Sequence, residues 1–579
     1  MVGFLLCIPA LAALTGAFTG AGGLLAGGRP RVIRMALGAV LVSLAVSLAG
    51  WLSLLTPAVL WAILGVSSAA FLFGSGMKPG REAIAPLAAV ALLLPLAAMP
   101  QTARDAMNHH MYLPRLWLSE GSIHRPAWCP FFSYPYLVES LYALVGGTFG
   151  FRVSGMVSLA GFAGAVAAAR HAAAPFGRRA ALLAPLVLLS IPEALRNATW
   201  AYSDSFLLLF SILAAGELAR DDGDATLAAL WGAAAGACKY NGFPVTVITL
   251  LVLAVRHRKR PGALAAPFGL ALALSATWAL PNAIEHGNPF HPMLGRLFGV
   301  EEEVPARTQE LLGAFSEYAA SVSTPSELLA LPVRMSVSGR WDDPRLYDGA
   351  SGPLLLLGVL LFLLLCRNRA QVLPAMAALV LTVLLSIPSA RVRYLFGPVG
   401  MLVPFAAAGL SRALGTGRLG RAAVGVAMAL CLVWSGSWLV RLYSSERPLE
   451  ALDPSFLENR LPYMPFYMEA DRVLEETDTT LFVNMGNRAF YWPSCAIFNS
   501  HRFPLDVLEP VWGGAGADDL ASSLRARGIS YVAMDMDIAD INITGELDDG
   551  EFGRWREFVA TRLEPVVSKG PYVLFRLPG

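Results

Sequence analysis

Three polar side chains stand close together just outside a long apolar run of the sequence. Asp105 comes five residues after Pro100, where the run ends, and His109 and His110 follow it. A carboxylate held at the mouth of a membrane can act as a general base that takes a proton from a hydroxyl group. Adjacent histidines on a helix point about 100° apart, so we expect one to form a hydrogen bond rather than both to bind one metal ion. The alternative is that Asp105 is an exposed acid at a helix end.

The composition places most of the chain in a membrane. Of its 579 residues 55% are hydrophobic and 15% charged, whereas soluble proteins carry about 25% charged residues. The formal net charge of +2 gives no reason to expect a nucleic-acid partner. The six cysteines show no CxxC spacing, which indicates neither a metal nor a redox site. Whether Cys129 and Cys495, both outside the apolar runs, form a disulfide stays open.

The apolar runs predict about fourteen transmembrane helices. Their centres lie at about residues 15, 44, 65, 91, 163, 187, 211, 233, 250, 272, 358, 380, 403 and 431. Lys and Arg accumulate in alternate loops, as they do in cytoplasmic loops of membrane proteins. This alternation predicts a multi-pass protein of the cell (inner) membrane with both termini extracytoplasmic. The first run is long enough to span, so we expect no cleaved signal peptide.

Long hydrophilic segments share the external side in this topology, and an external active site would be assembled from them. They are residues 101–152, residues 282–350 and the residues from about 443 onward. Within the first, SYPYLVESLYALVGGTFG (133–150) has aromatic and polar interruptions that favour a helix lying at the membrane interface over a span.

The last segment reads as a separate folded domain. It contains one helix-like run and three strand-like runs, at 518–528, 481–485, 529–535 and 572–577. This mixture predicts a small soluble α/β domain. We therefore expect a polytopic α-helical membrane protein in three parts, namely extra N-terminal helices (1–82), a transmembrane core (83–442) and a soluble extracytoplasmic α/β domain (443–579).

Several segments resemble membrane glycosyltransferases of the GT-C class, in particular bacterial and archaeal members related to the aminoarabinose and protein-mannosyl transferases. The region from Asp105 to Gly150 is similar to their first external loop, with matches at His110, Leu113, Pro114 and Glu139. Further similar blocks follow in the family's order, namely AYSDSFLLLF (201–210), CKYNGFP (238–244), EHGNPFHP (285–292), LYDGASGPLLLLG (346–358) and VRYLFGP (392–398). The resemblance begins near residue 84, which leaves residues 1–80 without a counterpart.

The resemblance implies the GT-C fold and an inverting transfer of a sugar from a polyprenyl-phosphate donor to an acceptor hydroxyl on the extracytoplasmic side. In this scheme Asp105 is the catalytic base, and cations stabilise the departing phosphate. The implied partners are the lipid-linked donor, a glycan, lipid or protein acceptor, and membrane lipids. The residues implied to bind donor or substrate are His109, His110, Glu139, Asp204, Lys239, Tyr240, Arg391, Arg393 and Tyr394.

These residues also have structural interpretations, which stay open. Lys239, Arg391 and Arg393 are basic residues at helix ends, where such side chains reach toward lipid headgroups. Asp204 at the start of an apolar helix also suits the helix dipole. No cofactor is predicted, and no ligand cluster on the external side indicates the divalent metal that some transferases use. We interpret Asp535 and Asp537 as a polar strand end.

Two other functions compete with the transferase. A polymerase or ligase of lipid-linked oligosaccharides would also use polyprenyl carriers, but such enzymes usually lack a large soluble terminal domain. A transporter or flippase would place charged residues deep within several spans. The apolar runs here carry their charges at the ends instead.

Overall fold

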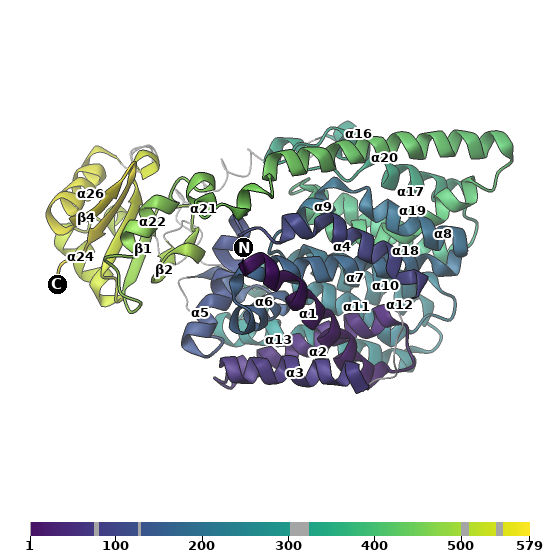
Figure 1. Cartoon of the computed structure of the whole chain (residues 1–579), viewed down its shortest axis with the longest axis horizontal. Helices are drawn as coiled ribbons and strands as arrows, with labels where there is room; N and C mark the ends of the chain where they lie inside the picture. Colours follow the sequence, from purple (N-terminus) through teal and green to yellow (C-terminus); the bar gives the residue numbers. More distant parts are fainter. Residues whose placement is uncertain (1, 74–79, 126–128, 301–323, 499–508, 540–547) are drawn as a thin grey trace. The chain divides into compact units, whose positions relative to one another are not determined.

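The computed structural model describes residues 2–73, 80–125, 129–300, 324–498, 509–539 and 548–579. The chain divides into two compact units (Figure 1). The helical unit comprises Met1–Gln101, Gly121–Ile123 and Ser133–Pro448. The α/β unit comprises Thr102–Glu120, His124–Phe132 and Leu449–Gly579. The segment 101–152, which the sequence predicts to be external, is therefore divided between the units, with Asp105 in the α/β unit and Glu139 in the helical unit.

The helical unit is built from helices. Its helices are α1 (Val2–Ala26), α2 (Arg31–Trp51), α3 (Pro57–Phe73), α4 (Ile84–Ala97), α6 (Leu137–Thr148), α7 (Gly155–Ala173), α8 (Arg178–Leu189), α9 (Pro192–Asn197), α10 (Asp204–Ala219), α11 (Ala225–Cys238), α12 (Phe243–Arg256), α13 (Ala265–His286), α14 (Gly295–Phe298), α16 (Pro325–Val337), α17 (Pro353–Leu365), α18 (Arg369–Ser386), α19 (Phe396–Ala413) and α20 (Arg418–Glu446).

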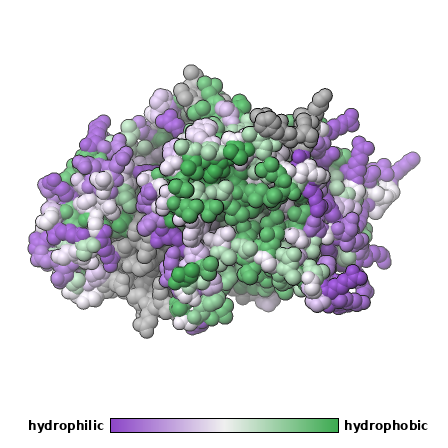
Figure 2. Space-filling model, turned by 90° about the horizontal axis from the view of Figure 1, so that it is seen from below, coloured by the Kyte–Doolittle hydropathy of each residue, from purple (hydrophilic) through white to green (hydrophobic). Residues whose placement is uncertain are grey.

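These helices form the membrane-embedded part of the protein. Within the described residues, seven helical segments are long and apolar enough to cross a membrane, and five apolar helices are shorter. Every predicted span centre falls inside a helix, although the full count of about fourteen spans stays a prediction. Apolar residues form a broad surface on the helical unit (Figure 2). Large side chains such as Leu272 and Leu430 are 72% and 65% exposed, which fits contact with lipid rather than water.

Small residues allow the membrane helices to pack closely. A Cβ atom on Gly38 of α2 would lie 1.6 Å from the carbonyl oxygen of Phe18 in α1, and one on Gly409 of α19 would lie 2.1 Å from that of Gly358 in α17. Only glycine permits backbones to approach this closely. Because lipid provides no hydrophobic driving force between helices, such close packing contributes much of their association.

Helices α2 and α3 pack against α6, the helix predicted at the membrane interface. Ser43 of α2 donates a hydrogen bond to the carbonyl oxygen of Leu137 (2.5 Å), and the hydroxyls of Ser47 and Ser140 lie 2.8 Å apart. The residues from Leu137 to Val145 are all buried. α6 therefore packs within the protein, and its position at the membrane interface stays a prediction. Both α2 and α3 belong to the region that had no counterpart in the resemblance.

The α/β unit is built on a five-stranded sheet with strand order β2-β1-β3-β5-β4. β1 pairs in parallel with β2 and β3, whereas β5 pairs antiparallel with β3 and β4. Leu481, Val532 and Phe558 belong to its buried apolar core. The elements are α5 (Tyr112–Glu120), α21 (Phe456–Arg460), α22 (Met464–Ala470), β1 (Thr479–Val483), β2 (Cys495–Phe498), α23 (Glu509–Trp512), α24 (Ala517–Ala526), β3 (Tyr531–Asp535), α26 (Asp549–Arg562), β4 (Glu564–Lys569) and β5 (Tyr572–Arg576).

Candidate active site

A buried ion pair joins two of the predicted site residues in the helical unit. Asp204 is fully buried at the start of α10, and the Nζ atom of Lys239 lies 3.3 Å from its Oδ1 atom. Lys239 has extended backbone between α11 and the short 3₁₀ helix Tyr240–Gly242, so it is not part of either helix. The Oδ2 atom of Asp204 is buried and has no hydrogen-bond partner in the described part of the chain. A buried oxygen of this kind is suited to accept a hydrogen bond from a bound hydroxyl or water.

Three cations lie around the ring of Tyr394. The distances to its centroid are 5.7 Å from Lys239 Nζ, 5.5 Å from Arg391 Cζ and 5.6 Å from Arg393 Cζ. Arg393 also lies 4.9 Å from the ring of Tyr202. Contact with aromatic rings offsets part of the repulsion among like charges. We call Lys239, Arg391, Arg393 and Tyr394 the cation cluster, because this arrangement suits a bound anion such as a phosphate group.

Tyr240 holds neighbouring segments together. Its hydroxyl lies 2.8 Å from the carbonyl oxygen of Ser133 and 2.6 Å from that of His291, and the side-chain amide of Asn282 donates to it at 3.2 Å. One hydroxyl has one proton to donate and two lone pairs. These contacts favour a positioning role for Tyr240.

Glu139 approaches the segment that leads to Asp204. It is buried in the first turn of α6, three residues before Tyr142. The hydroxyl of Tyr142 donates to the carbonyl oxygen of Tyr202 at 2.8 Å, two residues ahead of Asp204. Residues three apart on a helix share a face, so α6 presents Glu139 and Tyr142 to the same neighbourhood. The helical unit therefore gathers its predicted site residues around the start of α10.

The α/β unit holds the remaining predicted residues, Asp105, His109 and His110. Asp105 precedes a π-helical turn, Ala106–His110, a rare conformation that occurs frequently at functional sites. The imidazole centroids of His109 and His110 lie 4.0 Å apart, and His109 stacks on Phe131 at 4.6 Å. No group of three or more potential metal ligands occurs within the described ranges.

The helix after this turn is bound to the terminal residues of the chain. The hydroxyl of Tyr112 lies 2.8 Å from both the N and the O atom of Ala496 in the edge strand β2. The Nη1 atom of Arg115 donates to the carbonyl oxygens of Phe490 (2.6 Å) and Trp492 (2.5 Å). The C-terminal domain therefore helps to position the loop that carries Asp105. Cys129 and Cys495, whose pairing the sequence left open, are free thiols in this unit.

Arg115→Ala should detach this loop from the C-terminal residues. The change removes two hydrogen bonds from a charged, largely buried group, which costs roughly 1–3 kcal/mol of stability. We expect a lower melting temperature and faster amide hydrogen exchange across Thr102–Glu120. Arg472→Ala is the matched control, because the side chain of Arg472 is 71% exposed and makes a surface ion pair with Glu469. Equal exchange in both variants would contradict the anchoring role.

A second charged group surrounds α9, and reasoning from the sequence missed most of it. Glu193 is 1% exposed, and its Oε1 atom accepts a hydrogen bond from Asn197 at 2.5 Å. The Nη2 atom of Arg196 donates to both carboxylate oxygens of Asp342, at 2.7 and 2.6 Å. The guanidinium carbon of Arg196 lies 4.2 Å from the centroid of the Trp200 ring. The available signal was PEALRN (192–197), a charged stretch between two apolar runs.

The stability of the helical unit should depend on pH through Glu193. Burial raises the pKa of this carboxyl, which lies in the connection between α8 and α10, from 4.5 to about 8, while Arg196 acts in the opposite direction. Because the folded protein keeps a proton that the unfolded chain loses, stability falls as the pH rises from about 4.5 to 8, by at most about 1.4 kcal/mol per pH unit. Glu193→Gln should flatten that part of a melting-temperature profile. An unchanged slope would contradict this assignment.

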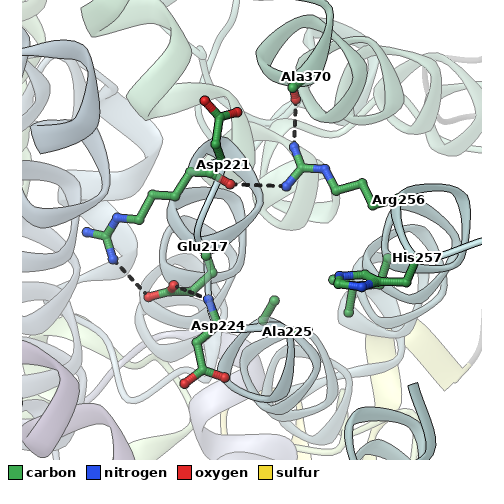
Figure 3. A pocket seen from close by; sticks show the side chains of 11 residues that line it. Glu217, Asp221, Asp224, Ala225, Arg256, His257 and Ala370 are labelled. Carbon is green, nitrogen blue, oxygen red and sulfur yellow. Dashed lines mark hydrogen bonds and ion pairs between the residues drawn. The ribbon is translucent and has the colours of Figure 1, made fainter. Parts of the chain in front are cut away.

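A pocket of about 280 Å³ lies at the other end of α10 (Figure 3). Glu217 accepts hydrogen bonds there from Arg220 (3.2 Å) and from the backbone of Asp224 (3.1 Å), while Arg256 donates to the carbonyl oxygen of Ala370 (2.6 Å). The 14 residues from Asp204 to Glu217 span about 20 Å of helix. This pocket is therefore separate from the cation cluster, and its charged groups connect the turn after α10 to α12 and α18.

Comparison with known proteins supports the fold. No protein-family model matches the chain, and no curated protein matches it. The structure of ArnT from Cupriavidus metallidurans bound to undecaprenyl phosphate is similar, with a TM-score of 0.52 and 13% identity over 86% of this chain and 97% of that chain. The structure of ArnT in the apo state has a TM-score of 0.51 and 14% identity, and the match covers 85% of this chain and 96% of that chain. The Archaeoglobus fulgidus oligosaccharyltransferase in the apo form has a TM-score of 0.45 and 12% identity, and the match covers 80% of this chain and 70% of that chain.

ArnT is an aminoarabinose transferase and belongs to the GT-C class that the sequence resembles. At such low identity, similarity of structure is evidence about the fold. The GT-C fold expected from the resemblance is confirmed: this chain has the fold of the membrane glycosyltransferase ArnT.

Proposed function

We propose that the protein is an inverting glycosyltransferase that moves a sugar from a polyprenyl-phosphate donor to an acceptor hydroxyl on the extracytoplasmic side of the membrane. The observation that carries this proposal is the cation cluster beside the buried Asp204–Lys239 pair. The ArnT fold supports it, since that structure is a complex with undecaprenyl phosphate. The lipid-facing helices supply an apolar environment for a polyprenyl tail.

In the proposed reaction the acceptor oxygen attacks the anomeric carbon of the donor sugar. The bond from that carbon to the phosphate oxygen breaks, and the polyprenyl phosphate leaves with the bonding electron pair. Asp105 takes the proton of the acceptor hydroxyl as the new bond forms. A single displacement of this kind inverts the anomeric configuration.

The cation cluster stabilises the negative charge that develops on the leaving phosphate. Lys239, Arg391 and Arg393 provide that charge from fixed positions, so little reorganisation is needed during the reaction. The ion pair with Asp204 restrains Lys239. Glu139 and Asp204 lie where they can orient sugar or acceptor hydroxyls, and Tyr394 holds the cations near one another.

Transfer of radiolabelled sugar tests this function. Purified protein in nanodiscs is incubated with a panel of polyprenyl-phosphate sugars and a membrane extract as the source of acceptors. We expect transfer from at least one donor and inhibition by added undecaprenyl phosphate. Transfer of whole oligosaccharides alone would instead favour the polymerase or ligase, and lipid movement across vesicles without transfer would favour the flippase.

A further inference from the structure

The loop between α16 and α17 places a strained acidic residue beside the cation cluster. Asp342, Tyr347 and Asp348 have positive φ angles of 59°, 63° and 47°, which residues other than glycine rarely adopt. Such conformations persist only where surrounding contacts hold them, and they concentrate at functional sites. Asp348 belongs to the block LYDGASGPLLLLG, to which reasoning from the sequence assigned no role.

A backbone hydrogen bond joins this loop to the segment that carries the arginines. The N–H of Val392, which lies between Arg391 and Arg393, donates to the carbonyl oxygen of Tyr347 at 2.9 Å. The Oδ1 atom of Asp348 accepts from the N–H of Asp342 at 3.1 Å. Asp348 and the two arginines therefore lie next in sequence to the two residues that this hydrogen bond joins.

The charges around Asp348 show which cations it faces. Burial raises the pKa of its carboxyl, and Arg393, Arg196 and Arg391 lower it, in that order of effect. Arg196 already has Asp342 as its own partner at 2.6 Å. The Nε atom of Arg391 is buried and has no hydrogen-bond partner among the residues that the structure describes. The carboxylate of Asp348 is thus a negative charge that acts on both arginines of the cation cluster, whereas Glu193, which also interacts with Arg393, has a pKa raised to about 8.

We propose that Asp348 is an internal counter-anion of Arg391 and Arg393 that weakens lipid-phosphate binding and so speeds release of the polyprenyl-phosphate product. This inference rests on the proposed function. The donor is a phosphodiester with one negative charge, whereas the product is a monoester with a charge of about −1.5 to −2 near pH 7. A fixed carboxylate repels a ligand in proportion to the ligand's charge. Asp348 therefore disfavours the product more than the donor, and it acts as a positioning residue, since it works through the two arginines.

Asp348→Asn removes this charge and keeps the shape of the side chain. We expect undecaprenyl phosphate to bind the full-length protein in nanodiscs about tenfold more tightly, a change of about 1.4 kcal/mol. The donor carries about half the charge of the product, so its binding free energy should change about half as much and its KM should fall about threefold. The kcat should fall because product release becomes slower. Asp343→Asn is the matched control, since Asp343 lies in the same loop and its side chain caps the turn at Arg345.

Weaker or unchanged binding of undecaprenyl phosphate by Asp348→Asn would overturn the inference, because a purely structural carboxylate would not oppose the ligand. Asp348→Ser keeps an acceptor for Asp342 and provides a second test if the asparagine variant does not fold. If the wild-type protein binds no undecaprenyl phosphate, the proposed function itself fails. If it binds and the Asp348 variants do not tighten binding, only the role of Asp348 fails.

Discussion

Asp105→Asn should reduce sugar transfer by about a hundredfold or more, the usual scale for the loss of a general base. The asparagine side chain has nearly the same shape but cannot take the proton of the acceptor hydroxyl. Asp105 is half-buried ahead of the π-helical turn, so we expect the variant to fold with a melting temperature close to that of the wild type. The measurement is the initial rate of transfer from the best donor at saturating acceptor.

Glu120→Gln controls for the loss of a negative charge from the same segment, because Glu120 is exposed at the end of α5. It should transfer sugar at the wild-type rate. If Asp105→Asn is as active as the control, Asp105 is a surface acid and another group must accept the proton. Binding of undecaprenyl phosphate should be retained in both variants, which separates loss of the base from loss of the donor site.

Local sequence patterns predicted most of the elements. Apolar runs located the membrane helices, and the runs at 481–485, 529–535 and 572–577 became β1, β3 and β5. The two remaining strands were missed for local reasons. β2 has only four residues, and β4 (Glu564–Lys569) contains a proline and has exposed charged residues at both ends. Short or edge strands carry little periodic signal.

Contacts between distant residues could not be read from the sequence. Tyr112 meets Ala496 across 384 positions, so nothing local showed that the Asp105 loop folds with the C-terminal residues. The burial of α6 likewise depends on serines of α2 about one hundred positions away. The resemblance picked out the residues of the cation cluster one by one. It gave no information about the charge balance around Asp348, which depends on a turn whose Asp342 pairs with Arg196 of a distant segment.

Variants of the ion pair between Asp204 and Lys239 should show whether Lys239 contributes to stability alone or also to catalysis. Lys239→Met leaves the fully buried carboxylate of Asp204 without its cation, and breaking a buried pair in this way costs about 3–5 kcal/mol. We expect a large fall in melting temperature together with loss of transfer. Neither result alone distinguishes a structural lysine from one that also binds the donor phosphate.

The double variant Lys239→Met, Asp204→Asn makes that distinction. Removing both charges eliminates the uncompensated carboxylate, so most of the lost stability should return, because replacing a buried pair as a whole is often neutral. Transfer should stay at least about a hundredfold below wild type, since the leaving phosphate has lost one of its three cations. Recovery of both stability and transfer would mean that Lys239 serves only to neutralise Asp204, and that Arg391 and Arg393 bind the phosphate without it.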